Sequence, residues 1–153
     1  MAAADPQRLW SALVAVYQPV LRDVVTALER DADIDSGAYS ALAYLDQAGG
    51  RMRLRELHDL MRVRYSQPGL SRLVQRLEDD GAVERRVDPD DRRGSIVSLT
   101  RAGRTRFRRA RQVYDAALAE HLGRNLPAAV ATALTRGLED LAQRRAADPA
   151  TTE

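Results

Sequence analysis

The sequence predicts a mainly α-helical protein of six helices, interrupted once by a β-hairpin. Its 153 residues, 44% of them hydrophobic, suit one compact domain with its own core. Apolar residues recur at spacings of three and four over most of the chain, which is the helical period. The pattern changes to that of strands only in residues 82–87 and 95–99.

The first two helices are separated by an acidic turn. The apolar stripe over residues 7–30 is wide enough to need cover from more than one side, and Pro19 is expected to kink or split this helix. Asp35 or Ser36 can cap the second helix, which Gly49 and Gly50 end. A short extended piece is expected at residues 51–53.

Two short helices follow, with few residues between them. The first covers residues 54–62, and its inward-facing positions are expected to be Leu54, Leu57, Leu60 and Met61. The second has Ser66 as its cap and Pro68 in its first turn, and Gly81 stops it.

The strands of the hairpin flank a charged loop over residues 88–94, which is rich in turn-forming residues. Thr100 can cap a fifth helix that runs to about residue 122, where Gly123 and Asn125 break it. Pro127 lies in the first turn of a sixth helix, which ends before Asp148.

This order of elements has the layout of a winged helix-turn-helix with a β-hairpin wing. Residues 35–100 are the expected DNA-binding region. Residues 1–34 and 101–146 carry more apolar surface than so small a region can cover, so these N- and C-terminal helices are expected to dimerise with a second copy. Residues 147–153 are expected to be a disordered tail.

Charge is distributed unevenly along the chain. The net charge of +2 divides into −4 over residues 1–50, +8 over residues 51–111 and −2 over residues 112–153. A basic middle segment in a nearly neutral protein indicates a polyanion as partner. Every basic residue is Arg, whose planar fork suits phosphates and guanine edges.

Two motifs then resemble a known family. Residues 70–85 read LSRLVQRLEDDGAVER, and residues 88–93 read DPDDRR ahead of VSLTRAG at residues 97–103. Together they are similar to the recognition helix and wing of the MarR (multiple antibiotic resistance regulator) family. The resemblance implies a homodimer that binds a pseudo-palindromic operator in double-stranded DNA, more often as a repressor, and that is often released by a small aromatic or phenolic effector.

The resemblance places the expected DNA contacts on three segments. The side chains expected at base edges in the major groove are Gln67, Ser71, Arg72 and Gln75. Those expected at phosphates are Arg64, Tyr65, Ser66 and Arg76. The turn before the recognition helix, residues 62–65, lacks the Gly that often stands there in the family, so its shape can differ.

In the wing, Arg92 and Arg93 are expected at the hairpin tip, where a narrow A·T-rich minor groove attracts Arg. Asp91 is expected to pair with Arg93 and to orient it. The alternative is a charged turn that only keeps the protein soluble.

Further residues allow two interpretations each. An effector pocket could be lined by Trp10, Tyr17, Tyr39, Tyr44 and His58, although aromatic residues at helical spacing are more often plain core. The fifth helix carries an Arg stripe that could follow the DNA backbone or pair with acidic residues of the N-terminal half: Arg101, Arg104, Arg108 and Arg111.

Several classes of protein are disfavoured. The absence of cysteine excludes a disulfide scaffold and a thiol nucleophile, and neither His58 nor His121 has a nucleophile or metal-ligand cluster at a recognisable spacing. No enzyme activity, metal or cofactor is therefore expected. With no membrane span or signal peptide visible, the cytoplasm is the default location. The alternative function is a ligand-independent architectural DNA-binding or protein-interaction module.

Overall fold

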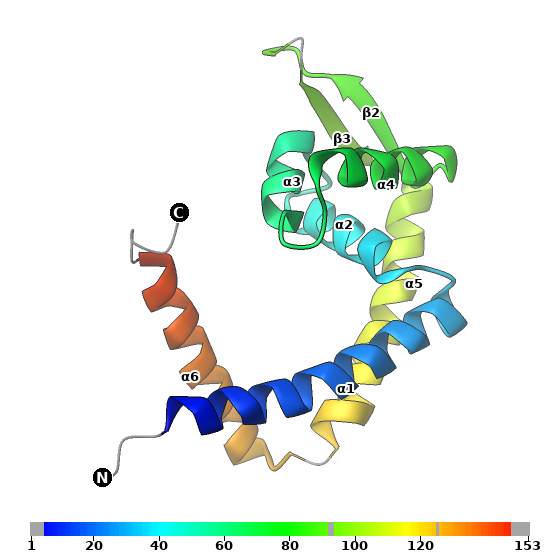
Figure 1. Ribbon diagram of the computed structural model, residues 1–153. Coiled ribbons are helices and arrows are strands. Elements are labelled where there is room, and N and C mark those ends of the chain that lie inside the picture. The colour runs from blue at the N-terminus through cyan, green and yellow to red at the C-terminus, as the bar shows by residue number, and fades with distance from the viewer. Residues whose placement is uncertain (1–4, 92–93, 125, 148–153) are drawn as a thin grey trace.

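The computed structural model describes residues 5–91, 94–124 and 126–147, and Figure 1 shows their arrangement. The elements follow in the order α1 (Pro6–Ala32), α2 (Ser36–Gln47), β1 (Arg51–Arg53), α3 (Leu54–Met61), α4 (Gln67–Asp79), β2 (Val83–Val87), β3 (Ser95–Leu99), α5 (Arg101–Leu118), the π-helical turn η1 (Ala119–Gly123) and α6 (Ala128–Ala147). The predicted fold class, six helices and a β-hairpin in winged helix order, is confirmed.

Side-chain caps start two of the helices that build the winged region. The Asp35 carboxylate accepts a hydrogen bond from the Ala38 amide at 2.8 Å, so the cap of α2 is Asp35 rather than Ser36. The Ser66 hydroxyl accepts from the Gly69 amide at 3.3 Å and starts α4, as predicted. Each cap satisfies an amide that has no partner inside its helix.

A three-stranded antiparallel sheet lies beside these helices, in the order β1-β3-β2. The predicted hairpin is β2–β3, and the short piece at residues 51–53 adds β1 on the other side of β3. Val97 of the central strand is fully buried and pairs with Met52 and Arg85. The sheet therefore closes one side of the core, and the hairpin projects beyond it as the wing (Figure 1).

One hydrophobic core joins α2, α3, α4, the sheet and the first half of α5. Its fully buried large side chains include Leu28, Leu42, Leu45, Leu57, Leu70, Leu73, Val74, Leu77 and Val97. The C-terminal half of α1 also packs into this core, whereas α5 runs away from the winged part and crosses α1 (Figure 1). α5 thus connects the winged region to the terminal helices.

The terminal helices expose much apolar surface. Each of the following side chains is more than 40% exposed: Leu9, Trp10, Val16 and Tyr17 on α1, Leu122 on η1, and Val130, Leu134, Leu138 and Leu141 on α6. By length and composition α1 could also span a membrane, but one such helix near the N-terminus is weak evidence, and α1 packs along α5. The exposed stripe indicates a protein partner.

Three sequence expectations need correction. α1 runs through Pro19 without being split; Pro19 is exposed, so the carbonyl that loses its helical hydrogen bond can be hydrated. Leu60 was expected to face inward but is 50% exposed, because Leu57 and Met61, four residues apart, form the buried stripe of α3. The fifth helix ends at Leu118 and continues as a π-helical turn.

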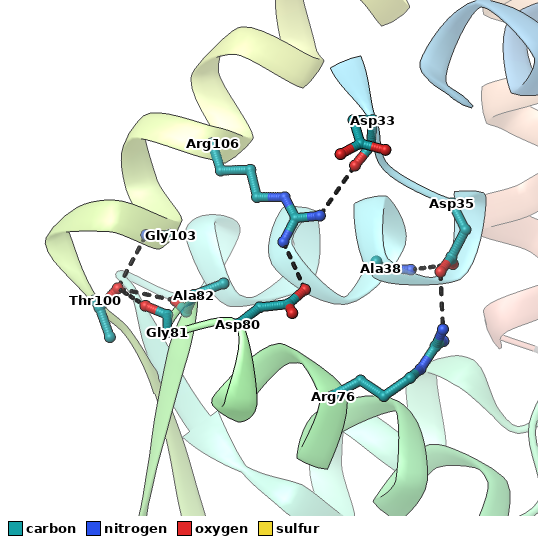
Figure 2. A network of polar contacts seen from close by, with 10 residues as sticks. All are labelled: Asp33, Asp35, Ala38, Arg76, Asp80, Gly81, Ala82, Thr100, Gly103 and Arg106. Carbon is teal, nitrogen blue, oxygen red and sulfur yellow. Dashed lines mark hydrogen bonds and ion pairs between the residues drawn. The ribbon is translucent and has the colours of Figure 1, made fainter. Parts of the chain in front are cut away.

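The start of α5 approaches the backbone of the turn after α4 very closely. A Cβ atom on Gly103 would overlap the carbonyl oxygen of Ala82. The Thr100 hydroxyl accepts from the Gly103 amide at 2.9 Å and donates to the Gly81 carbonyl at 2.7 Å. Figure 2 shows these contacts around Thr100. The LTRAG motif therefore attaches α5 to the end of the recognition helix.

We predict that Gly103→Ala lowers the free energy of unfolding by at least about 2 kcal/mol, because backbone must move to admit the methyl group. Urea unfolding followed by circular dichroism measures this. Ala102→Ser is the control: it also adds one heavy atom, but at an exposed neighbouring position, and should cost no more than about 0.5 kcal/mol. Equal stability of Gly103→Ala and the control would contradict the close contact.

Candidate nucleic-acid interface

α4 separates an apolar face from a polar one. Its inner face is buried, and its outer face exposes Gln67, Arg72, Gln75 and Arg76, with Ser71 half-buried at the margin. The sequence-predicted base-reading residues therefore share one exposed helix surface. Amide and guanidinium groups on such a surface can form paired hydrogen bonds with adenine and guanine edges in the major groove.

Two of these side chains already have partners within the chain. The Gln75 amide donates to the Asp79 carboxylate one turn later, at 3.0 Å. Arg76 Nη2 lies 3.4 Å from Asp35 Oδ2, and Figure 2 shows the guanidinium directed at the start of α2. Both sides of this pair are well exposed, so the pair is worth at most about 1 kcal/mol and can be exchanged for a phosphate.

The turn before α4 also contacts the start of α2. Arg64 Nη2 donates to the Ser36 hydroxyl at 3.0 Å. The Tyr65 ring packs over Gly37, where a Cβ atom would overlap the phenol oxygen. Tyr65 thus uses the space left by a glycine in α2, so it supports the helix-turn-helix, whereas Arg64 and the helix-capping Ser66 lie on the exposed side.

The tip of the wing lies partly outside the described residues: Arg92 and Arg93 are not among them, and their minor-groove role stays a prediction. The loop around them is shaped by backbone hydrogen bonds. The Gly94 amide donates to the Asp91 carbonyl at 2.8 Å, and the Asp88 amide donates to the Gly94 carbonyl at 3.1 Å. These bonds close the loop between Asp88 and Gly94, and the pairing of Asp91 with Arg93 stays a prediction.

Asp88 at the base of the wing is a buried carboxylate that sequence reasoning missed. It is 1% exposed, its Oδ2 lies 2.6 Å from Arg53 Nε, and its Oδ1 accepts from the Asp90 amide at 3.0 Å. Arg53 also reaches the Asp90 carboxylate at 3.2 Å. The Arg53 side chain, at the end of β1, therefore holds the wing loop against the body of the domain.

A crevice of about 220 Å³ separates α3 and the start of α4 from the wing loop. His58, one of the predicted effector residues, lines it together with Gln67, Asp91 and the exposed Arg55. Arg55 is a further exposed cation, in the same crevice as Gln67, for which the sequence offers little indication. Its only sequence signal is the alternation of three arginines in residues 51–55.

The predicted effector residues do not meet in one pocket within a single chain. Trp10 is 67% exposed on α1, and Tyr17 lines an apolar groove between α1 and α5. Tyr39 and Tyr44 line a different groove, between α2 and α5. Of these two grooves, the second, of about 280 Å³, lies between α2 and α5.

The α2–α5 groove has an aromatic floor. The Tyr39 ring stacks on Tyr114 with centroids 4.7 Å apart and contacts Phe107 at 5.7 Å. Burial raises the pKa of Tyr39 to about 12, so its phenol stays neutral at any physiological pH. Arg111 stands at the groove edge and pairs with Asp115 at 3.2 Å.

The arginines of α5 divide into two groups. Arg106 and Arg109 reach the α1–α2 turn: Arg106 contacts Asp80 and the Asp33 carbonyl, and Arg109 donates to the Asp31 carbonyl at 3.1 Å. Arg101, Arg104 and Arg108 line a shallow groove with Asp46 on another side of the helix. Both interpretations of the stripe stay predictions; Arg106 and Arg109, which lie beside it, donate to backbone carbonyls of the N-terminal half.

Within residues 5–91, 94–124 and 126–147, no group of three or more His, Asp or Glu side chains is placed to hold a metal ion. The main features of the site are an exposed recognition helix, a wing beside it and basic side chains around both. They define a winged helix-turn-helix protein.

Comparison with known proteins agrees with the assignment to the winged helix-turn-helix class. Residues 32–94 match the family model described as the MarR family. No curated protein matches the chain by sequence. AbsC, a MarR family transcriptional regulator from Streptomyces coelicolor, has a TM-score of 0.78 at 23% identity, over 97% of this chain and 99% of that chain.

Two further solved structures are similar over most of their length. A MarR family regulator from Streptomyces coelicolor in complex with DNA has a TM-score of 0.76 at 25% identity, over 94% of this chain and 89% of that chain. An organohalide-sensing regulator in its 2,4-dichlorophenol-bound form has a TM-score of 0.74 at 17% identity, over 94% of this chain and 82% of that chain. Residues 32–94 are thus similar to the MarR family of transcription regulators, and the chain shares the fold of solved regulators from that family.

We predict that Asp88→Asn lowers the free energy of unfolding by about 1–3 kcal/mol, because Arg53 loses its charged partner at a buried position. Urea unfolding at neutral pH measures this. Asp90→Asn removes the same charge from the same arginine, but at a side chain that is 80% exposed, and should cost less than about 0.5 kcal/mol. If both variants are as stable as the unmodified chain, Asp88 does not anchor the wing.

Proposed function

We propose that this chain is a homodimeric transcription regulator that binds a pseudo-palindromic operator, represses from it, and is released by a small aromatic ligand. The observation that carries the DNA-binding part is the outer face of α4. Gln67, Arg72 and Gln75 are exposed together on one helix whose opposite face is fully buried. A rigid helix with this surface is the part of a helix-turn-helix protein that enters the major groove.

The charge distribution supports the same function. Residues 51–111, which carry the net charge of +8, include α3, α4 and the wing. Arg64, Arg76 and Arg55 are exposed around the recognition surface and are suited to phosphate contacts. A similar structure, that of a MarR family regulator, was solved in complex with DNA.

A second copy is the proposed partner of the terminal helices. The exposed apolar side chains of α1 and α6 extend over two long helices, and obligate homodimer interfaces have this apolar character. The dimer would also place two copies of α4 on one duplex, as a palindromic operator requires.

An effector is proposed for the groove between α2 and α5. Its Tyr39, Tyr44 and Tyr114 offer aromatic walls, and Arg111 offers a cation for an ionised phenol or carboxylate. The groove touches both the winged region and α5, so a ligand there could favour one arrangement of the two over another. The similar structure with bound 2,4-dichlorophenol supports this ligand class. The proposed function needs no catalysis and is located in the cytoplasm.

We predict that light scattering at micromolar concentration gives twice the chain mass of 17.0 kDa. Leu138→Asp should shift the mass towards that of one chain, because it places a charge on the exposed apolar stripe of α6. Arg136→Asp, an exposed polar position on the same helix, serves as the control and should stay dimeric. A mass of 17.0 kDa for the unmodified chain would rule out the proposed homodimer.

The DNA-binding function is tested by in-vitro selection of bound sequences from random duplexes. We expect a palindromic consensus; binding without sequence preference would indicate an architectural module instead. On the selected operator, Arg72→Ala should lose about 1–3 kcal/mol of preference over random DNA, because it removes a base contact.

Arg76→Ala is the matched variant on the same helix. It should weaken operator and random DNA alike and reduce the salt dependence by about one counterion, because it removes a phosphate contact. Equal losses on both duplexes for Arg72→Ala would contradict its base-reading role. The same assay with added 2,4-dichlorophenol tests the effector: operator affinity unchanged at saturating ligand would contradict this ligand class.

A further inference from the structure

The side chain of Arg106 connects three elements of the fold. It belongs to α5, its Nη1 lies 2.9 Å from the Asp80 carboxylate at the C-terminal end of α4, and its Nη2 donates to the Asp33 carbonyl at 3.0 Å. Figure 2 shows the guanidinium between these two oxygens. Asp33 ends α1 in a left-handed conformation with φ of 50°. One planar group therefore joins the recognition helix, the first terminal helix and α5.

Neighbouring contacts hold the same turn from both sides. Arg109, the next turn of α5, donates to the Asp31 carbonyl, and Arg76 of α4 pairs with Asp35 at the start of α2. The turn over residues 31–35 is thus fixed to α5 on one side and to the recognition helix on the other. The carbonyl of Asp33 accepts a directional bond, so the fork of Arg106 defines an orientation as well as a distance.

We propose that Arg106 and Asp80 are positioning residues that fix the angle between the recognition helix and the dimerisation helices, and thereby set the operator half-site spacing that the dimer accepts. The inference rests on the proposed function. In a dimeric helix-turn-helix protein the two recognition helices must enter grooves about 34–36 Å apart, one turn of duplex. Each α4 is placed relative to the dimer axis through α1 and α5, which are the elements that Arg106 joins to it.

The solvent exposure of Arg106 and Asp80 distinguishes a positioning role from a contribution to the stability of the fold. The Arg106 side chain is 32% exposed and that of Asp80 is 54% exposed. An ion pair this open to solvent adds little to the free energy of folding. Its loss should therefore change the distribution of α4 orientations far more than it changes the stability of the fold.

The experiment measures how operator affinity depends on half-site spacing. The selected operator is prepared with zero, one or two base pairs inserted at or deleted from its centre, and the dissociation constant is measured for the full-length dimer on each duplex. The variants are Arg106→Gln and Asp80→Asn. The control is Arg108→Gln, which also removes one positive charge from α5. The Arg108 side chain donates to Thr105 of the same helix, so its loss removes a hydrogen bond within α5 rather than one between α5 and α4.

The unmodified protein and Arg108→Gln should prefer the selected spacing over a one-base-pair change by about tenfold or more. Arg106→Gln and Asp80→Asn should reduce that ratio to about threefold or less, with an unchanged dimer mass and unchanged base preference within each half-site. Arg106→Lys should give an intermediate ratio, because one ammonium cannot hold both oxygens in the geometry of the fork.

A merely structural role would lower affinity on all spacings by the same factor and leave the ratio unchanged, and this outcome would overturn the inference. Asp80→Asn keeps the test valid if Arg106→Gln fails to fold. Failure of the proposed function itself would look different: the unmodified chain would select no operator at all. An unchanged ratio for both variants on an operator that the unmodified chain does select refutes the positioning role alone.

Discussion

The rest of the structure depends on one close backbone approach, that of α5 to the turn after the recognition helix. Gly103 lies against the Ala82 carbonyl, and Thr100 both caps α5 and donates to Gly81. No side chain fits between these segments, so the start of α5 stays in contact with the turn after α4, and the contact of Arg106 with Asp80 acts on the angle between the two helices. The wing and the recognition helix can then keep a fixed relation to each other, as a surface that fits two grooves of a duplex requires.

The sequence was sufficient for those parts of the fold that local signals determine. Helix caps at Asp35, Ser66 and Thr100, and the change of period at the hairpin, gave the element order, because each depends on residues a few positions apart. The helix is not split at Pro19 and Leu60 does not face inward, because both environments depend on which helix face is covered, and only packing decides that. The exposed outer face of α4 was predicted from the same periodicity that predicted its buried face.

The candidate site was predicted less completely, because its supporting contacts join distant segments. Asp88 looked like one more charge in a polar loop, yet it is buried by an arginine 35 positions earlier in the sequence, Arg53. Arg106 has no sequence signal that separates it from the other arginines of α5, yet it binds oxygens 26 and 73 residues away. The effector residues were grouped by aromatic character, and the fold distributes them over separate surfaces of the chain.

Several polar side chains of the recognition surface have partners within the chain. Arg76 pairs with Asp35, Gln75 donates a hydrogen bond to Asp79, and Arg64 donates one to Ser36. These groups of the recognition surface are therefore held by weak, exposed partners. Such contacts limit the rotamers of long side chains, and since exposed pairs are worth at most about 1 kcal/mol, their exchange for phosphate or base costs little. Asp35 is fixed in place by its own cap bond to Ala38, and it therefore holds the Arg76 guanidinium in one direction. The acidic residues near α4 therefore orient the arginines but bind them only weakly. The segment keeps its net positive charge and with it its attraction for DNA.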